Sequence, residues 1–168
     1  LGAEGATVEI ANEEADPTAP DEPADAKLIP TTPIRGFFSN YPKGWNAFHE
    51  SFLKRAKEGG IDVLFLGDSL TQGWGGAGKE AWDASFAPLK AANFGIGGDK
   101  TGNILWRLDH GEVDGLSPKL VVLMIGVNNL WSGKNTGEEI AAGTKAIVQK
   151  LRTKLPQSKV LVLGVLPM

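Results

Sequence analysis

Hydrophobic and polar positions follow two different periods from about residue 45 to the end of the chain. Short, nearly continuous apolar runs predict buried strands at 61–66, 91–94, 119–125 and 159–166. Between them, apolar residues recur at helical spacing, which predicts helices at 45–58, 79–86, 101–108 and 136–155. Strands that alternate with helices indicate an α/β fold with a parallel sheet covered on both faces.

Three segments sharpen this picture. The run at 119–125 is too continuous for a half-exposed strand, so it is predicted as a central parallel strand. The helix at 136–155 has a start signal, because Thr136 can cap it and Glu139 follows three residues later. The last run, 159–166, reads as another buried strand, yet the chain stops directly after it. One face of that strand would stay uncovered, so we expect the C-terminal part of the domain to be missing from this chain.

Composition separates the first 33 residues from the rest. Five of the ten prolines lie there, and residues 1–26 hold eight acidic residues and no basic one. Residues 1–33 are therefore interpreted as an acidic, Pro-rich tail or arm, and 34–168 as the N-terminal part of one domain. A linker-like tail without an initiator Met is compatible with secretion or a periplasmic location, which the sequence leaves open.

The charge and residue counts exclude several classes of function. After residue 26 the chain has twelve acidic and seventeen basic residues without a dense basic stripe, which argues against a nucleic-acid partner. The chain contains no cysteine and only two histidines, so a thiolate or His-rich metal site is not expected. Its apolar runs are also much shorter than the ~20 residues of a membrane span.

Polar and glycine-rich segments follow three of the predicted strands. Gly67-Asp68-Ser69 follows the first, 95–100 follows the second and 126–129 follows the third. The carboxyl ends of parallel strands lie at one edge of a sheet, where ligands bind in such folds. We therefore expect these three segments to meet at a single site.

Each segment has a functional and a purely structural interpretation. Ser69 is either a nucleophile at the rim or the cap of a helix, and it is not in a Gly-x-Ser-x-Gly elbow because position 71 is Thr. Gly98 belongs to a glycine cluster that fits neither a phosphate loop nor a dinucleotide fingerprint. It provides either an oxyanion donor or a tight turn that needs positive φ. Asn128 is either an oxyanion donor or a turn residue.

Taken together, "GDSLTQGW", "NFGIGGDKTGNILWRL" and "IGVNN" resemble the conserved blocks of the SGNH, or GDSL-like, hydrolase superfamily. Among its branches, the sequence is similar to the one that holds the catalytic subunits of platelet-activating-factor acetylhydrolase and bacterial carbohydrate acetylesterases. The resemblance implies a three-layer α/β/α, flavodoxin-like sandwich. It also implies that Ser69 is the nucleophile, that Gly98 supplies an oxyanion N–H and that Asn128 supplies an oxyanion side chain.

One block of the superfamily is absent. Its acid and base lie in an Asp-x-x-His motif, but Asn46 stands three residues before His49 and Arg107 three before His110. Both histidines are interpreted as ordinary surface or helix-flanking residues. The catalytic Asp and His are therefore expected outside these 168 residues, on a C-terminal segment that could be a separate chain.

The resulting expectation is a serine ester hydrolase that needs no cofactor or metal. The resemblance implies removal of a short acyl group, acetyl in the first instance, from a small-molecule or carbohydrate ester. Trp74 and Trp131 are candidate platforms for a sugar ring, with ordinary packing as the alternative. Another hypothesis is an inactive binding module that keeps the oxyanion pocket without a base. A flavodoxin-like nucleotide-binding domain is disfavoured because no phosphate loop fits.

Overall fold

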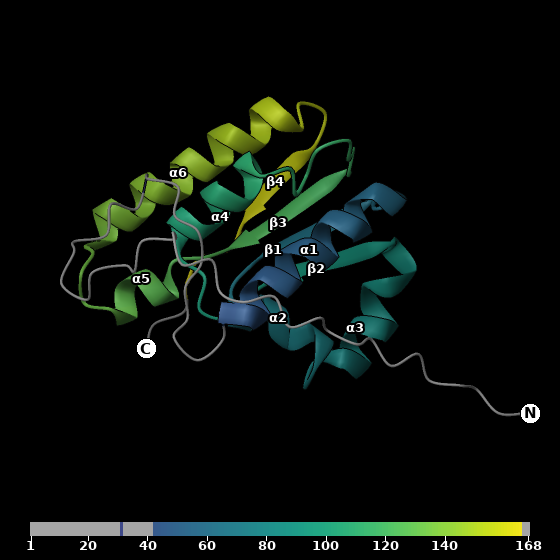
Figure 1. Ribbon diagram of the computed structural model, residues 1–168, viewed down its shortest axis with the longest axis horizontal. Coiled ribbons are helices and arrows are strands. Elements are labelled where there is room, and N and C mark those ends of the chain that lie inside the picture. The colour runs from purple at the N-terminus through teal and green to yellow at the C-terminus, as the bar shows by residue number, and fades with distance from the viewer. Residues whose placement is uncertain (1–30, 32–41, 166–168) are drawn as a thin grey trace, which may run out of the picture.

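Four parallel strands form the sheet of this domain (Figure 1). The computed structural model describes residue 31 and residues 42–165, so the predicted tail lies outside the described residues except for position 31. The strand order is β2-β1-β3-β4. The strands are β1 (Val63–Gly67), β2 (Ala91–Gly95), β3 (Leu120–Met124) and β4 (Lys159–Val162). Each lies within two residues of its predicted start, and β3 is an interior strand as predicted.

Three long helices cover one face of the sheet: α1 (Pro42–Glu58), α4 (Thr101–Asp109) and α6 (Gly137–Lys154). Their apolar stripes form one core with the strand residues that face them, including Leu64, Leu66 and Leu123, each no more than 1% exposed. On the second face, the ring of Phe65 packs edge-on against Trp82 of α3 (Lys79–Ser85). Helices therefore lie on both faces, which confirms the predicted α/β class.

The helix boundaries follow local capping chemistry. Thr136 accepts a hydrogen bond from the N–H of Glu139, and the Glu139 side chain accepts one from the N–H of Thr136. This reciprocal pair satisfies two amide groups that the first turn of α6 would otherwise leave unpaired. The predicted start of this helix is confirmed.

The last strand differs from its prediction. Strand β4 was expected to be buried, but Leu161 is 47% exposed and Val162 is 44% exposed. The reason is its position at the edge of the sheet, where it pairs only with β3 among the described residues. Val160 still packs against the core. Strand β4 is therefore apolar on both faces, although other described residues cover one of these faces only in part.

Register brings the ends of three strands together. Gly67 at the end of β1 lies opposite Gly95 of β2 on one side and Met124 of β3 on the other. The segments that follow these residues therefore leave the same edge of the sheet from adjacent positions. Two of them continue into short helices that periodicity could not predict, α2 (Ser69–Gln72) and α5 (Val127–Trp131).

Candidate active site

Ser69 is the first residue of α2, and only Asp68 separates it from strand β1. The chain can turn sharply here because Gly67 has no side chain: a Cβ at that position would lie 2.1 Å from Thr71 Oγ1 and 2.5 Å from the carbonyl oxygen of Met124. The N-cap is Asp68, whose carboxylate accepts a hydrogen bond from the N–H of Leu70 at 3.0 Å. The cap interpretation of Ser69 is therefore wrong, and the Ser69 side chain is exposed.

Asp68, the residue before the serine, is a buried helix cap rather than an exposed acid. It is only 1% exposed, and this burial raises the pKa of its carboxyl group above the usual value, while the hydrogen bond from Leu70 lowers it. Within the described residues, no side-chain hydrogen bond of Ser69 is found. Its hydroxyl is thus available to a partner from outside this part of the chain.

Gly98 lies in a tight turn after β2. The N–H of Asp99 donates to the carbonyl oxygen of Ile96 at 3.2 Å, and Gly98 has φ +81°, a conformation that favours glycine. The preceding N–H, that of Gly97, donates to Oε1 of Gln72 at 2.8 Å. The N–H of Gly98 has no acceptor among the described residues. Gly98 therefore satisfies both interpretations, because it adopts the positive φ that the turn needs and keeps a backbone N–H free to donate.

Asn128 lies in the first turn of α5 and reaches across to the Gly98 segment. Its Nδ2 donates to the backbone carbonyl oxygen of Asp99 at 2.9 Å. A primary amide has two N–H bonds, so the second remains for another acceptor. The next residue, Asn129, is 1% exposed and accepts from the N–H of Thr101 at 3.0 Å. Two consecutive asparagines of α5 thus hold the segment that contains Gly98.

Neither described histidine is placed to act on Ser69. His49 is only 6% exposed inside α1, and its Nδ1 lies 2.9 Å from Oε2 of Glu112. The prediction of a surface or helix-flanking residue is therefore wrong for His49, because the buried carboxylate and stacking on Trp45 draw it into the core. His110 follows the last residue of α4, at the end remote from the rim, as expected.

A buried charged cluster lies beneath the Gly98 segment, and the sequence reasoning missed it. Arg107 is 0% exposed and donates to Asp99 Oδ2 at 2.7 Å, to Glu112 Oε2 at 2.8 Å and to the carbonyl oxygen of Phe94 at 2.6 Å. The available signal was an arginine inside the apolar stretch "ILWRL", since an arginine there needs buried partners.

Asp99 connects this cluster to the site. Its second carboxylate oxygen accepts from Trp45 Nε1 at 2.6 Å. Burial raises the pKa of Asp99 to about 6, although the charge of Arg107 and the hydrogen bond from Trp45 lower it. The side chain of Asp99 is thus fixed from α1 and α4, while its carbonyl oxygen binds the amide of Asn128.

The two predicted tryptophan platforms differ in their surroundings. Trp74 follows α2 in a short 3-10 helix, η1 (Gly73–Gly75), and packs edge-on against Phe86 with 5.4 Å between the ring centroids. Trp131 at the end of α5 is 75% exposed. Leu70, beside Ser69, and Leu130, two residues after Asn128, are also 51% and 45% exposed. The rim therefore offers apolar surface mainly from α2 and α5.

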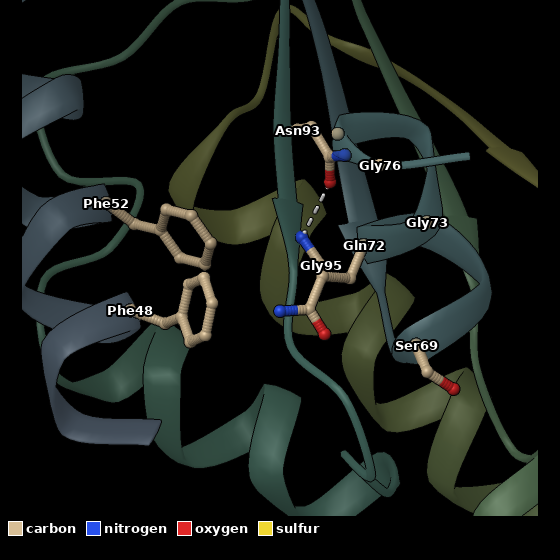
Figure 2. A pocket seen from close by; sticks show the side chains of 9 residues that line it. Phe48, Phe52, Ser69, Gln72, Gly73, Gly76, Asn93 and Gly95 are labelled. Atoms are coloured by element: carbon tan, nitrogen blue, oxygen red, sulfur yellow. Dashed lines mark hydrogen bonds between the residues drawn. The ribbon is translucent and has the colours of Figure 1, made fainter. Parts of the chain in front are cut away.

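A cavity of about 560 Å³ adjoins α2 (Figure 2). Its walls include Phe48 and Phe52 of α1, and Ser69 and Gln72 of α2. Figure 2 shows the hydroxyl of Ser69 directed away from the two phenylalanine rings, whereas the amide of Gln72 points toward them. The hydroxyl that the sequence predicts as the nucleophile is thus directed away from the part of the cavity wall formed by Phe48 and Phe52.

Residue 31 and residues 42–165 contain neither a cluster of metal ligands nor a membrane-spanning helix. No group of three or more His, Cys, Asp or Glu side chains there is arranged to hold a metal ion. Among the helices in this part of the chain, none combines the length and apolar character needed to cross a membrane.

Comparison with known proteins places the chain in a family. The model of the GDSL-like lipase/acylhydrolase family matches residues 65–168. The chain belongs to this family. Its match begins in strand β1 and includes all three segments at the rim, so the resemblance to SGNH hydrolases is confirmed.

Two curated relatives carry a more specific name. Platelet-activating factor acetylhydrolase IB subunit alpha2 of Homo sapiens is 46% identical over 123 residues, which are 73% of this chain and 52% of that protein. Subunit alpha1 of Bos taurus is 40% identical over 147 residues, 88% of this chain and 59% of that protein. The chain thus spans about half the length of the curated relatives it matches.

A solved structure supports the fold. A Bacteroides fragilis protein described as an acylhydrolase superposes with a TM-score of 0.53 over 67% of this chain and 55% of its own, at 19% identity. At this identity the similarity concerns the fold alone.

Proposed function

We propose that this chain carries the nucleophile and oxyanion site of a serine ester hydrolase that removes a short acyl group. The observation that carries the proposal is the pairing of Asn128 with the Gly98 segment beside the exposed Ser69. Gly98 and Asn128 each keep an N–H without an acceptor among the described residues, next to a hydroxyl without a partner. Hydrogen-bond donors fixed in advance beside a nucleophile are what acyl transfer requires.

The reaction then runs in two halves. Ser69 Oγ attacks the carbonyl carbon of the ester while a histidine takes the hydroxyl proton, and the carbonyl oxygen becomes an oxyanion. The N–H groups of Ser69 and Gly98 and the amide of Asn128 stabilise that charge. The oxyanion collapses and expels the alcohol, which takes the proton from histidine, and water hydrolyses the acyl-enzyme by the same steps. We propose that this histidine and its aspartate come from outside the 168 residues.

The acyl group is proposed to be acetyl, because both curated relatives are named acetylhydrolases. The same names favour a lipid that carries the acetyl ester over the carbohydrate expected from the resemblance alone. The exposed apolar side chains of Leu70, Leu130 and Trp131 at the rim fit a lipid better than a polar sugar, with Trp131 as the side chain most open to contact. Trp74 is the weaker candidate, because its ring already packs on Phe86.

The experiment uses the complete natural protein that contains these residues. Hydrolysis of p-nitrophenyl acetate is measured for the wild type, for Ser69→Ala and for Ser85→Ala, a serine exposed at the end of α3. We expect Ser69→Ala to lose activity and Ser85→Ala to keep it. Equal rates for the wild type and Ser69→Ala would refute the proposed site.

Substrate choice is tested on the same protein. Release of acetate is compared between an acetylated glycerophospholipid and an acetylated sugar at equal concentration. Faster release from the lipid would support the proposal, and faster release from the sugar would restore the carbohydrate assignment.

A second candidate is an inactive binding module. It is favoured by one observation: within the described residues, neither histidine contacts Ser69. Binding of the acetylated lipid without any Ser69-dependent release of acetate would establish this alternative.

A further inference from the structure

We propose that Gln72 is a positioning residue for the oxyanion site: its side-chain oxygen holds the Gly97 N–H and thereby sets the direction of the Gly98 N–H. This inference rests on the proposed function and deepens it. Gln72 is the last residue of α2, one helical turn after Ser69, and Oε1 accepts from the N–H of Gly97 at 2.8 Å. The bond links the element that carries the expected nucleophile to the segment that carries the expected donor.

Gly97 lies tightly against α2. A Cβ at this position would be 2.9 Å from Oε1 of Gln72 and 3.8 Å from Cβ of Ser69. The Gln72 oxygen and the Ser69 side chain therefore border the same face of Gly97. A small rotation of the 97–98 peptide would change both the distance and the direction between the Gly98 N–H and Ser69.

Gln72 itself is well placed to act as a fixed point. Its backbone N–H donates to the carbonyl oxygen of Asp68 at 2.8 Å, which closes the short helix α2. The preceding carbonyl oxygen, that of Thr71, accepts from Asn93 Nδ2 at 2.9 Å, so α2 is also tied to strand β2. Both bonds hold the peptide unit that precedes Gln72, and on the other side the N–H of Gly73 donates to the carbonyl oxygen of Ser69, so the side chain extends from backbone that is held before and after the residue.

Two consecutive glycines make such a fixed point necessary. Gly97 and Gly98 together have access to a wide range of backbone conformations, and Gly98 uses one with φ +81°. An oxyanion site accelerates a reaction only if its donors already point at the place where charge develops. The bond from Gln72 removes freedom on the N-terminal side of Gly98, as the bond from Asn128 to Asp99 does on the C-terminal side.

The competing explanation is that Gln72 only fills space. Its side chain lines the cavity of about 560 Å³ described above and a smaller neighbouring one of about 380 Å³. Gln72→Met separates the two explanations, because methionine keeps the length and volume of the side chain and removes the acceptor. Gln72→Glu keeps an acceptor oxygen. Gln149→Met makes the same change at an exposed position of α6 and serves as the matched control.

The test makes three measurements on the complete natural protein: the kinetics of p-nitrophenyl acetate hydrolysis, which give kcat and KM, thermal stability, and hydrogen exchange of the Gly97 amide by NMR. For Gln72→Met we expect kcat to fall roughly tenfold with KM within about twofold, as for the loss of one hydrogen bond that acts on the transition state. Its Gly97 amide should exchange faster, whereas Gln72→Glu should keep that amide protected. Gln149→Met should match the wild type in all three measurements.

Two results would overturn the role of Gln72 and leave the proposed function standing. One is a wild-type kcat in Gln72→Met while Ser69→Ala is inactive. The other is a rise in KM at constant kcat, which would make Gln72 a substrate contact. Absence of Ser69-dependent hydrolysis in the wild type would instead refute the proposed function, and the positioning role of Gln72 with it.

Discussion

The side-chain amide of Asn128 donates to the backbone carbonyl oxygen of Asp99 across 2.9 Å, next to the glycine that carries the expected oxyanion N–H. These two residues come from the segments after β3 and β2, which are separated in the sheet by β1. The bond therefore closes the rim over the end of β1, where Ser69 lies. The amide thus joins two of the three segments at this edge, and the third, which carries Ser69, follows the strand between them.

Asn128→Ala should lower kcat more than it raises KM. The substitution removes the remaining amide N–H that we assign to the oxyanion, and loss of one such donor typically costs about 10²–10³ in kcat. Rates are measured with p-nitrophenyl acetate in the complete protein, beside thermal stability, because the bond to Asp99 is lost as well. A drop in stability with full activity at a temperature where the variant is folded would contradict the assignment.

Gly95→Ala should destabilise the protein by displacing α2 from the end of β2. A Cβ there would lie 2.3 Å from the backbone nitrogen of Gln72 and 2.8 Å from the carbonyl carbon of Thr71, neither of which can move freely. Overpacking of this kind costs about 1–3 kcal/mol. The free energy of unfolding in urea measures the loss. Gly75→Ala is the matched control, since its Cβ would meet nothing within 4 Å, and similar values for both variants would refute the clash.

Arg107→Met should be among the most damaging substitutions in the core. It leaves the carboxylates of Asp99 and Glu112 buried without their cation, and such a loss costs about 3–5 kcal/mol. Urea unfolding measures the change. The control is Lys79→Met, which breaks an ion pair to Asp83 whose side chains are 64% and 54% exposed and should leave the unfolding free energy nearly unchanged. A similar loss of unfolding free energy in Arg107→Met and Lys79→Met would contradict the claim that burial makes the Arg107 cluster important.

The stability contributed by Asp99 should depend on pH in a defined direction. The pKa of its carboxyl group is about 6 in the folded protein against 3.8 for an ordinary aspartate, so the unfolded chain releases this proton first as pH rises. The contribution is therefore fully present below about pH 4 and is lost as pH rises through 6. Asp99→Asn cannot ionise and should lack this slope. The measurement is the unfolding free energy of the wild type minus that of the variant, from pH 4 to 7. This difference should fall as pH rises, and a rise with pH would refute the raised pKa of Asp99.

The sequence was informative where local patterns decide structure. Continuous apolar runs located the strands, and Thr136 with Glu139 marked the start of α6, because capping depends on residues three positions apart. Motifs after successive strands correctly predicted a shared edge, since parallel strands with helical crossovers leave no other arrangement. What periodicity could not supply were α2 and α5, because helices of four and five residues are too short to show a period.

By itself, then, the sequence determined the fold class, the family and the three segments at the rim. Tertiary structure alone decided which donors and acceptors are hydrogen-bonded there. Asp68 rather than Ser69 caps α2, the side chain of Gln72 accepts from the Gly97 N–H, and the carbonyl oxygen of Asp99 accepts from one N–H of Asn128. It also decided that Arg107 lies buried between two carboxylates. The physical reason is that hydrogen bonds and buried ion pairs join residues that are far apart in the sequence. Spacing and hydropathy along the chain do not indicate which residues will pair in this way.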